Sequence, residues 1–438
     1  MVNNKYRIPI DYYALMFICF LFIVMAFLLD TPMNVMRGFG AINISRSVLV
    51  TDYIALAGLG ATLLNAAVSC GLFLFLLILT KTPPNGKIIA ALFLTLGFAM
   101  FGKNIVNTIP LCIGVLIYAK VHKDKFGTYL INAMFAATVA PIVSEIAFSS
   151  EAEYIPAVWR FIIAYAVGIF IGFIFPIIVE SVKRMHNDYC LYNSGIAGGF
   201  IATFAVGVFR SMGYEVNPEN FWDTSPTTTT YLAIGAFTFS ALAIAFGLII
   251  GGAKTAFKNF LRIVRERDRG NNDYFTYYGG TCYINIGIMC MVATSTMLLL
   301  SIPINGPILG GIITIAGFAV AGKHMRNTIP VLMGSIVAAQ LNSFDLTGAN
   351  NALAILFSTG LAPIACKFGW LWGIIAGFMH VSVAIFIGDL NGGLNLYNNG
   401  FAGAFVAITL VPLIVFFNKM LFNKEDFGHF EHRRRKDD

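Results

Sequence analysis

The chain has 438 residues, of which 58% are hydrophobic and only 12% are charged. Soluble globular proteins carry roughly 25% charged residues, so this composition excludes a chain of two or three soluble domains. The apolar residues fall in long runs without charge, which is typical of membrane-spanning helices. The sequence therefore predicts an all-α polytopic membrane protein.

The net charge of +7 does not indicate a nucleic-acid partner, because the basic residues lie in short loops and near the C-terminus. The positive-inside rule places them there in a membrane protein, so the lipid bilayer is the predicted partner. The seven cysteines show no CxxC or Cys/His spacing, which predicts no metal site and no cofactor. The histidines are also dispersed, and we expect no enzyme.

The apolar segments form two sets along the chain, and the first segment ends at Asp30 without a small-residue cleavage site, which predicts a retained helix. The first set comprises residues 12–29, 53–80, 88–102, 104–119, 128–144, 161–179 and 189–209. The second set comprises residues 231–252, 274–322 with a break at 303–307, 327–344, 346–366, 368–388 and 390–418.

An internal repeat accounts for these two sets of apolar segments. Residues 85–114 align without a gap to residues 305–334, and 13 of 30 positions are identical. A second block follows around Pro141 and Pro363, and a third around Tyr192 and Tyr397. Three collinear blocks predict a tandem duplication, with membrane repeats at 1–220 and 221–420 and a basic cytoplasmic tail at 421–438.

Loop charge predicts the orientation in the membrane. Basic residues gather in a predicted loop at 253–273, in the tail and in smaller clusters: Lys254, Lys258, Arg262, Arg265, Arg267, Arg269, Arg433, Arg434, Arg435, Lys436, Lys5, Arg7, Lys120, Lys123, Lys125, Lys183 and Arg184. Acidic residues gather on the other side: Glu145, Glu151, Glu153, Glu215, Glu219 and Asp223. Both termini are therefore predicted on the cytoplasmic side of the cell membrane, with the second repeat inverted relative to the first.

Two segments of each repeat are short for a membrane crossing. Residues 88–102 would form a helix of about 22 Å, against the roughly 30 Å of a hydrocarbon core. We interpret 88–102 and 104–119 as a re-entrant hairpin, which leaves about five transmembrane helices per repeat. The alternative is that both arms cross fully, giving seven spanning helices per repeat.

An Asn-Thr-Ile-Pro motif occurs once in each repeat and supplies candidate pathway residues: Asn107, Thr108, Pro110, Asn327, Thr328 and Pro330. Proline inside an apolar helix frees backbone carbonyls. Broken backbone at membrane depth persists only where it is buried in protein or faces a watery cavity. The neighbouring amide and hydroxyl groups could then hold an ion or polar solute. The alternative is a proline kink satisfied by a neighbouring helix.

Lys103 and Lys323 occupy matched positions, each directly after a glycine. A lysine at membrane depth is costly and usually functional, and it pairs with an acid or meets an anionic ligand. The alternative is that each lysine extends to the membrane surface. Asn65 and Asn285 also match, and either lines a cavity or bridges helices.

The third repeat block opens the last apolar segment of each repeat. Tyr192 and Tyr397 are predicted in the interfacial aromatic belt, and Asn193 and Asn398 are predicted as helix N-caps. The glycines that follow are typical of close helix contacts. We expect a structural role for this block.

The duplicated pattern resembles inverted-repeat secondary transporters. Divalent-anion/sodium symporters carry hairpins with Ser-Asn-Thr tips followed by proline, and the two Asn-Thr-Ile-Pro motifs are similar to these tips. Val106 and Arg326 stand where the symporters have serine. The chain as a whole is similar to an uncharacterised family of duplicated bacterial membrane proteins.

These observations predict a secondary transporter of a small polar, anionic solute that works by alternating access of two inverted repeats. No acidic pair is retained at depth, because the matched Asp52 and Asp273 lie at loop-facing helix starts. A cation carrier would be expected to keep such an acid. The alternative is a passive channel for an ion or small solute, with a central pore at the Asn-Thr-Ile-Pro motifs. The sequence is compatible with a homo-oligomer.

Overall fold

The computed structural model describes residues 8–183, 185, 188–216, 221–267, 273–341 and 348–422. Within these residues the fold is all-helical, with isolated bridges and no β-strand. Some of the residues used to predict the orientation lie outside the described residues: Lys5, Arg7, Arg184, Glu219, Arg269 and the tail from residue 423 onward. The predicted all-α class is confirmed.

The helices follow one another with short connections. The first half of the chain forms α1 (Ile10–Leu29), α2 (Pro32–Asn43), α3 (Tyr53–Ala57), α4 (Leu59–Leu79), α5 (Gly86–Phe98), α6 (Ile105–Val121), α7 (Phe126–Ala136), α8 (Ala140–Phe148), α9 (Ala157–Lys183) and α10 (Asn193–Ser211). The second half forms α11 (Pro226–Gly251), α12 (Ala253–Arg265), α13 (Tyr274–Tyr278), α14 (Cys282–Leu299), α15 (Gly306–Gly317), α16 (Met325–Leu341), α17 (Ala349–Ser358), α18 (Ala362–Phe368), α19 (Trp370–Asn391) and α20 (Asn398–Phe422).

Ten helical stretches of the described chain are long and apolar enough to cross a membrane, five before residue 220 and five after it. They are Ile10–Leu29, Leu59–Leu79, Phe126–Phe148, Ala157–Lys183, Ser194–Ser211, Pro226–Gly251, Tyr274–Leu299, Ala349–Phe368, Trp370–Asn391 and Asn398–Met420. The chain is therefore a multi-pass helical membrane protein by length and composition. The short predicted segments correspond to α5 and α6, which have 13 and 17 residues.

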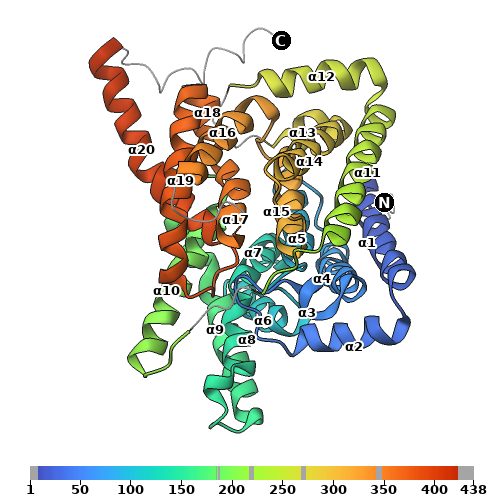
Figure 1. The fold of residues 1–438 in the computed structure, drawn as a ribbon, viewed down its shortest axis with the longest axis vertical. Coiled ribbons are helices and arrows are strands. Elements are labelled where there is room, and N and C mark those ends of the chain that lie inside the picture. The colour runs from blue at the N-terminus through green and yellow to red at the C-terminus, as the bar shows by residue number, and fades with distance from the viewer. Residues whose placement is uncertain are drawn as a thin grey trace.

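The predicted loop at 253–273 is wrong in its first part, because Ala253–Arg265 form the amphipathic helix α12. Ala256, Phe260 and Ile263 are buried, and the basic side chains are exposed. Helix α12 follows α11 as α2 follows α1. Figure 1 shows α12 along the upper edge of the molecule and α2 lying crosswise at the lower right, above the lowest turns of α9.

The two short helices α5 and α15 cross near the centre of the molecule (Figure 1). A Cβ added to Gly97 would lie 2.5 Å from the carbonyl oxygen of Gly310, and a Cβ on Gly310 would lie 2.5 Å from that of Gly97. Only glycine permits backbones to approach this closely. Helices α10 and α20 meet in the same way, because a Cβ on Gly195 would lie 2.7 Å from the Cα of Gly400.

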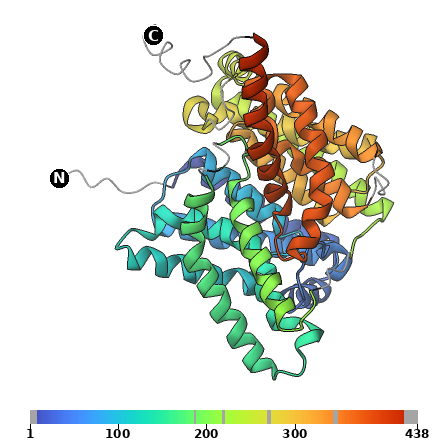
Figure 2. The ribbon, with the colours of Figure 1, turned by 90° about the vertical axis from the view of Figure 1, so that its left-hand side faces the viewer.

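Contacts between the two halves therefore run through the interior. Figure 2 shows the yellow to red second half above the blue to green first half. Helix α5 packs against α4 and α15, whereas α6 packs against α7 and α9. The end of α5 and the residues that follow it consequently lie where the halves meet.

Candidate functional site

Lys103 and Lys323 lie in the turns between short helices, α5–α6 and α15–α16. Each turn needs a left-handed residue, and Gly102 and Gly322 supply it with φ values of 74° and 115°. Both lysine side chains are fully buried. The alternative in which they extend to the membrane surface is therefore wrong.

The ammonium group of Lys323 lies among hydroxyl groups and aromatic rings. It donates to the hydroxyl of Tyr192 and to Oγ1 of Thr359, the latter at 2.8 Å. It also lies 4.5 Å from the ring centroid of Tyr192 and 5.5 Å from that of Phe318. Ring quadrupoles attract a cation in this arrangement.

Lys103 occupies the corresponding place in the first half but has fewer polar contacts. Its Nζ donates to the carbonyl of Met134 at 3.2 Å and lies 5.9 Å from the ring centroid of Phe98. The ring of Phe98 packs edge-on against Tyr397, with centroids 5.3 Å apart. The hydroxyl of Tyr397 is buried and makes no hydrogen bond among the described residues.

Tyr192 and Tyr397 connect the two lysine environments. Their ring centroids lie 4.7 Å apart, and both side chains are at most 1% exposed. The prediction that these tyrosines lie in the interfacial belt is therefore wrong. Their place in the third repeat block is the sequence signal that could have indicated a central position for these tyrosines. We define Lys103, Lys323, Tyr192 and Tyr397 as the central cluster.

Neither lysine forms an ion pair with an acidic residue in the described part of the chain. A buried charge without a counter-charge is strongly unfavourable. At membrane depth such a lysine commonly meets an anionic ligand or gives up its proton. The central cluster therefore holds two buried ammonium groups beside aromatic rings, without an acidic counter-charge among the described residues.

Asn65 and Asn285 fix the backbone that carries the lysines. The amide of Asn65 donates to the carbonyls of Ala99 and Lys103, at 2.7 and 2.9 Å. Asn285 donates to the matched carbonyls of Ala319 and Lys323, at 2.8 and 2.7 Å. Both asparagines bridge a long helix to the lysine turn, and the Oδ1 atom of each has no hydrogen-bond partner among the described residues.

The asparagine of each Asn-Thr-Ile-Pro motif holds the same turn from the other side. Asn107 donates to the carbonyl of Gly102 at 3.0 Å, and Asn327 donates to that of Gly322 at 2.9 Å. The Oδ1 atom of each accepts from the backbone N–H three residues earlier, at 3.0 Å. These are helix-capping bonds. Most of the amide's bonding capacity is thus used within the turn.

The prolines lie within continuous helices. Helix α6 runs through Pro110 and α16 runs through Pro330. The carbonyl of Val106, which Pro110 leaves without an intrahelical donor, accepts from the hydroxyl of Tyr165 on α9 at 3.1 Å. The interruptions of the helices therefore lie at Gly102 and Gly322, ahead of the motifs.

The two motifs lie apart. Figure 1 places α6 in the lower part of the molecule and α16 near its top. The residues that meet near the centre belong to the ends of α5 and α15 and the starts of α10 and α20. Among the predicted site residues, the structure connects Lys103 and Lys323 through the tyrosine pair.

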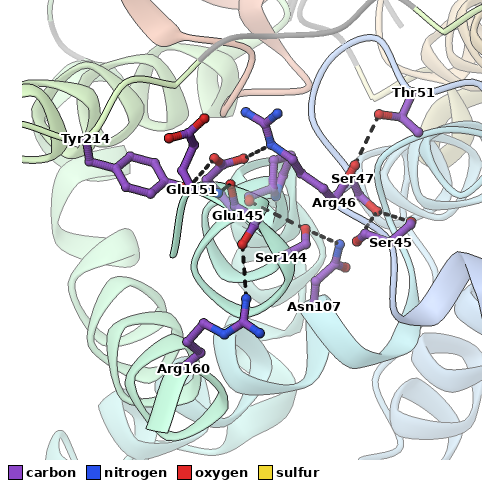
Figure 3. A network of polar contacts seen from close by, with 12 residues as sticks. Ser45, Arg46, Ser47, Thr51, Asn107, Ser144, Glu145, Glu151, Arg160 and Tyr214 are labelled. Carbon is purple, nitrogen blue, oxygen red and sulfur yellow. Dashed lines mark hydrogen bonds and ion pairs between the residues drawn. The ribbon is translucent and has the colours of Figure 1, made fainter. Parts of the chain in front are cut away.

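A second polar group lies beside the first Asn-Thr-Ile-Pro motif (Figure 3). Glu145 on α8 is fully buried, and its Oε2 lies 2.6 Å from Nε of Arg46. The hydroxyl of Tyr214 donates to Oε1 of the same carboxylate at 2.7 Å. Burial raises the pKa of Tyr214 above its ordinary value, so this hydroxyl keeps its proton at neutral pH. Asn107 donates to Ser144 beside this group, at 3.3 Å.

Comparison with known proteins assigns the chain to a family. The family described as Protein of unknown function (DUF1576) matches residues 31–211 and 252–416. Each matched segment begins directly after the first helix of its half, α1 or α11. No curated protein and no solved structure matches the chain significantly. Because the family covers most of its length, the chain belongs to the DUF1576 family of multi-pass membrane proteins.

Proposed function

We propose that this protein is a secondary transporter of a small anionic solute, with Lys103 and Lys323 as the solute-binding cations. The observation that carries the proposal is the complete burial of both lysines without an acidic partner among the described residues. A solute carboxylate or oxyanion would supply the missing charge. The tyrosine hydroxyls of the central cluster would add donors that select for an anion.

Matched contacts between the halves support two repeats related by pseudo-symmetry. The N–H of Leu191 donates to the carbonyl of Gly360, and the N–H of Leu396 donates to that of Thr138, both at 2.9 Å. Each bond joins one half to the matched position of the other. The placement of α12 at the top of the molecule and of α2 in its lower half supports inversion of the repeats (Figure 1). Inverted halves around a shared site are the usual basis of alternating access.

The short helices support a re-entrant arrangement of α5 with α6. A helix of 13 residues extends about 20 Å, which is less than a hydrocarbon core. The turn that carries the lysine would then lie inside the membrane, where each half presents one cation to the shared centre. We propose the same arrangement for α15 with α16.

Uptake into proteoliposomes tests the proposal. The purified chain is reconstituted in vesicles and screened with radiolabelled dicarboxylates, phosphate and sulfate, with and without the same solute inside. A carrier that works by alternating access shows faster uptake when solute is present on the far side, whereas a channel does not. The variants Lys103→Gln and Lys323→Gln should each lower transport, and the double variant should nearly abolish it.

Lys120→Gln is the matched control, because Lys120 lies exposed at the end of α6. It should leave uptake unchanged. Transport at the unchanged rate in the Lys103→Gln/Lys323→Gln variant, or uptake of cations alone, would overturn the proposal. Rapid flux of an anion without stimulation from the far side would support the passive channel instead.

A further inference from the structure

A basic cavity lies at the start of α16, apart from the central cluster. Its volume is about 350 Å³, and its walls include Arg267, Arg326, Lys367, His324 and Trp370, with Glu266 as the acidic lining residue. This volume lies within the range of small-molecule sites. When His324 is neutral, the three cationic side chains and the one carboxylate among these lining residues carry a net charge of +2.

In the first half, the residues that match Arg267 and Lys367 neutralise each other's charge. Arg267 corresponds to Arg46 at an offset of 221 residues, and Lys367 corresponds to Glu145 at an offset of 222. Arg46 and Glu145 form an ion pair at 2.6 Å. The second half keeps the arginine but replaces the carboxylate with a lysine, so two cations line the cavity where the first half holds a cation and an anion.

Two further side chains point to a ligand in this cavity. Arg326 adds a cation where the first half has Val106, and it lies in the first turn of α16, the end of a helix that favours anions. His324 is only 1% exposed, and its ring nitrogens have no well-formed hydrogen bond beyond an approach to the main chain of Glu266. A buried polar ring normally has a partner.

We propose that this cavity binds a small oxyanion of about two negative charges, a dicarboxylate or a phosphate group. The oxyanion takes the place that the carboxylate of Glu145 fills in the first half. Arg267, Arg326 and Lys367 contribute charge-assisted hydrogen bonds, and His324 adds a neutral one. None of the four belongs to the central cluster, so this proposal does not rest on the proposed transport function.

Binding is measured on the full chain in nanodiscs of neutral phosphatidylcholine, in a buffer free of oxyanions. Inorganic phosphate and succinate are titrated separately. Trp370 lines the cavity, so a Trp159→Phe/Trp222→Phe/Trp372→Phe variant reports binding through its fluorescence. Thermal unfolding provides a second readout, because a ligand that binds only the folded state raises Tm.

The wild type should show a saturable fluorescence change and a higher Tm with phosphate, succinate or both. Arg326→Gln and Lys367→Gln should each weaken binding by about tenfold or more, as expected for one charge-assisted hydrogen bond. Lys120→Gln should bind like the wild type.

Lys367→Glu is the sharpest variant, because it restores the carboxylate of the first half. It should lose oxyanion binding and also unfold at a higher temperature than the oxyanion-free wild type, since the introduced carboxylate can pair with Arg267. Unchanged binding in Lys367→Glu, or no saturable binding of either oxyanion by the wild type, would overturn the proposal.

The oxyanion could be a free solute or the phosphate of a lipid headgroup. Nanodiscs containing phosphatidic acid distinguish these sources. A headgroup in the cavity should raise the Tm of the wild type but not of Lys367→Glu, and should suppress the response to added phosphate. A free solute should give the same response in both kinds of nanodisc.

Discussion

Asn65 and Asn285 make the same pair of hydrogen bonds in the two halves of the chain. Each amide donates to two main-chain carbonyls of the turn that carries a buried lysine, at 2.7 to 2.9 Å. The four carbonyls belong to residues at matched positions of the two halves, so the same pair of hydrogen bonds holds each lysine turn. The lysine turns are held by side chains from the preceding long helix.

Asn65→Ala and Asn285→Ala should each lower the free energy of unfolding by about 1–3 kcal/mol, because buried carbonyls lose their donors. Thermal or denaturant unfolding in detergent measures this. Asn259→Ala on α12 is the control, since Asn259 is half-exposed and should tolerate the change. Wild-type stability in both buried variants would contradict the supporting role.

The crossing of α5 and α15 predicts a strong dependence on glycine. Gly310→Ala should destabilise the protein by about 1–3 kcal/mol, because the added methyl group would lie 2.7 Å from the Phe101 ring. Gly235→Ala on α11 is the matched control, because a Cβ there meets no atom within 4 Å. It should be neutral or stabilising by up to about 1 kcal/mol. Equal melting temperatures for the two variants would argue against the close crossing.

Substitution of the asparagines and substitution of the threonines in the Asn-Thr-Ile-Pro motifs should have different effects. Asn107→Ala and Asn327→Ala remove capping bonds and should cost about 1–2 kcal/mol of stability, measured by unfolding in detergent. The hydroxyls of Thr108 and Thr328 donate to the neighbouring asparagine, at 3.4 and 3.1 Å. Thr108→Ala and Thr328→Ala should therefore leave folded yield and uptake in vesicles nearly unchanged, because both threonines lie outside the central cluster. Reduced uptake at the wild-type folded yield would instead place the threonine hydroxyls on the solute pathway.

Cysteine labelling tests the predicted orientation. On a cysteine-free background, Ser150→Cys should react with a membrane-impermeant maleimide only from outside the cell, and Lys258→Cys only from the cytoplasmic side. Ser150 precedes α9, Lys258 lies on the basic face of α12, and both are exposed. The physical reason is the asymmetry of Lys and Arg between the loops. Labelling of position 150 from the cytoplasm alone would refute the inverted topology.

The sequence by itself determined the class of the protein and located its long apolar segments, but left open whether each half has five or seven spanning helices. Hydrophobic runs are local properties, so their length is readable without a fold. The repeat also identified Lys103, Lys323, Asn65 and Asn285, because matched residues at a constant offset need only the sequence. Helix α12 could also have been predicted from the sequence, because its basic residues recur at helical spacing.

Only the tertiary structure decided where polar residues of apolar segments lie. Lipid tails and a protein interior are equally apolar, so hydropathy does not tell a tyrosine at the membrane surface from one in the core. Tyr192 and Tyr397 are central because α10 and α20 cross at Gly195 and Gly400. The basic cavity likewise joins Arg267, Arg326 and Lys367 from three separate segments. Their proximity depends on helix packing, which no local pattern encodes.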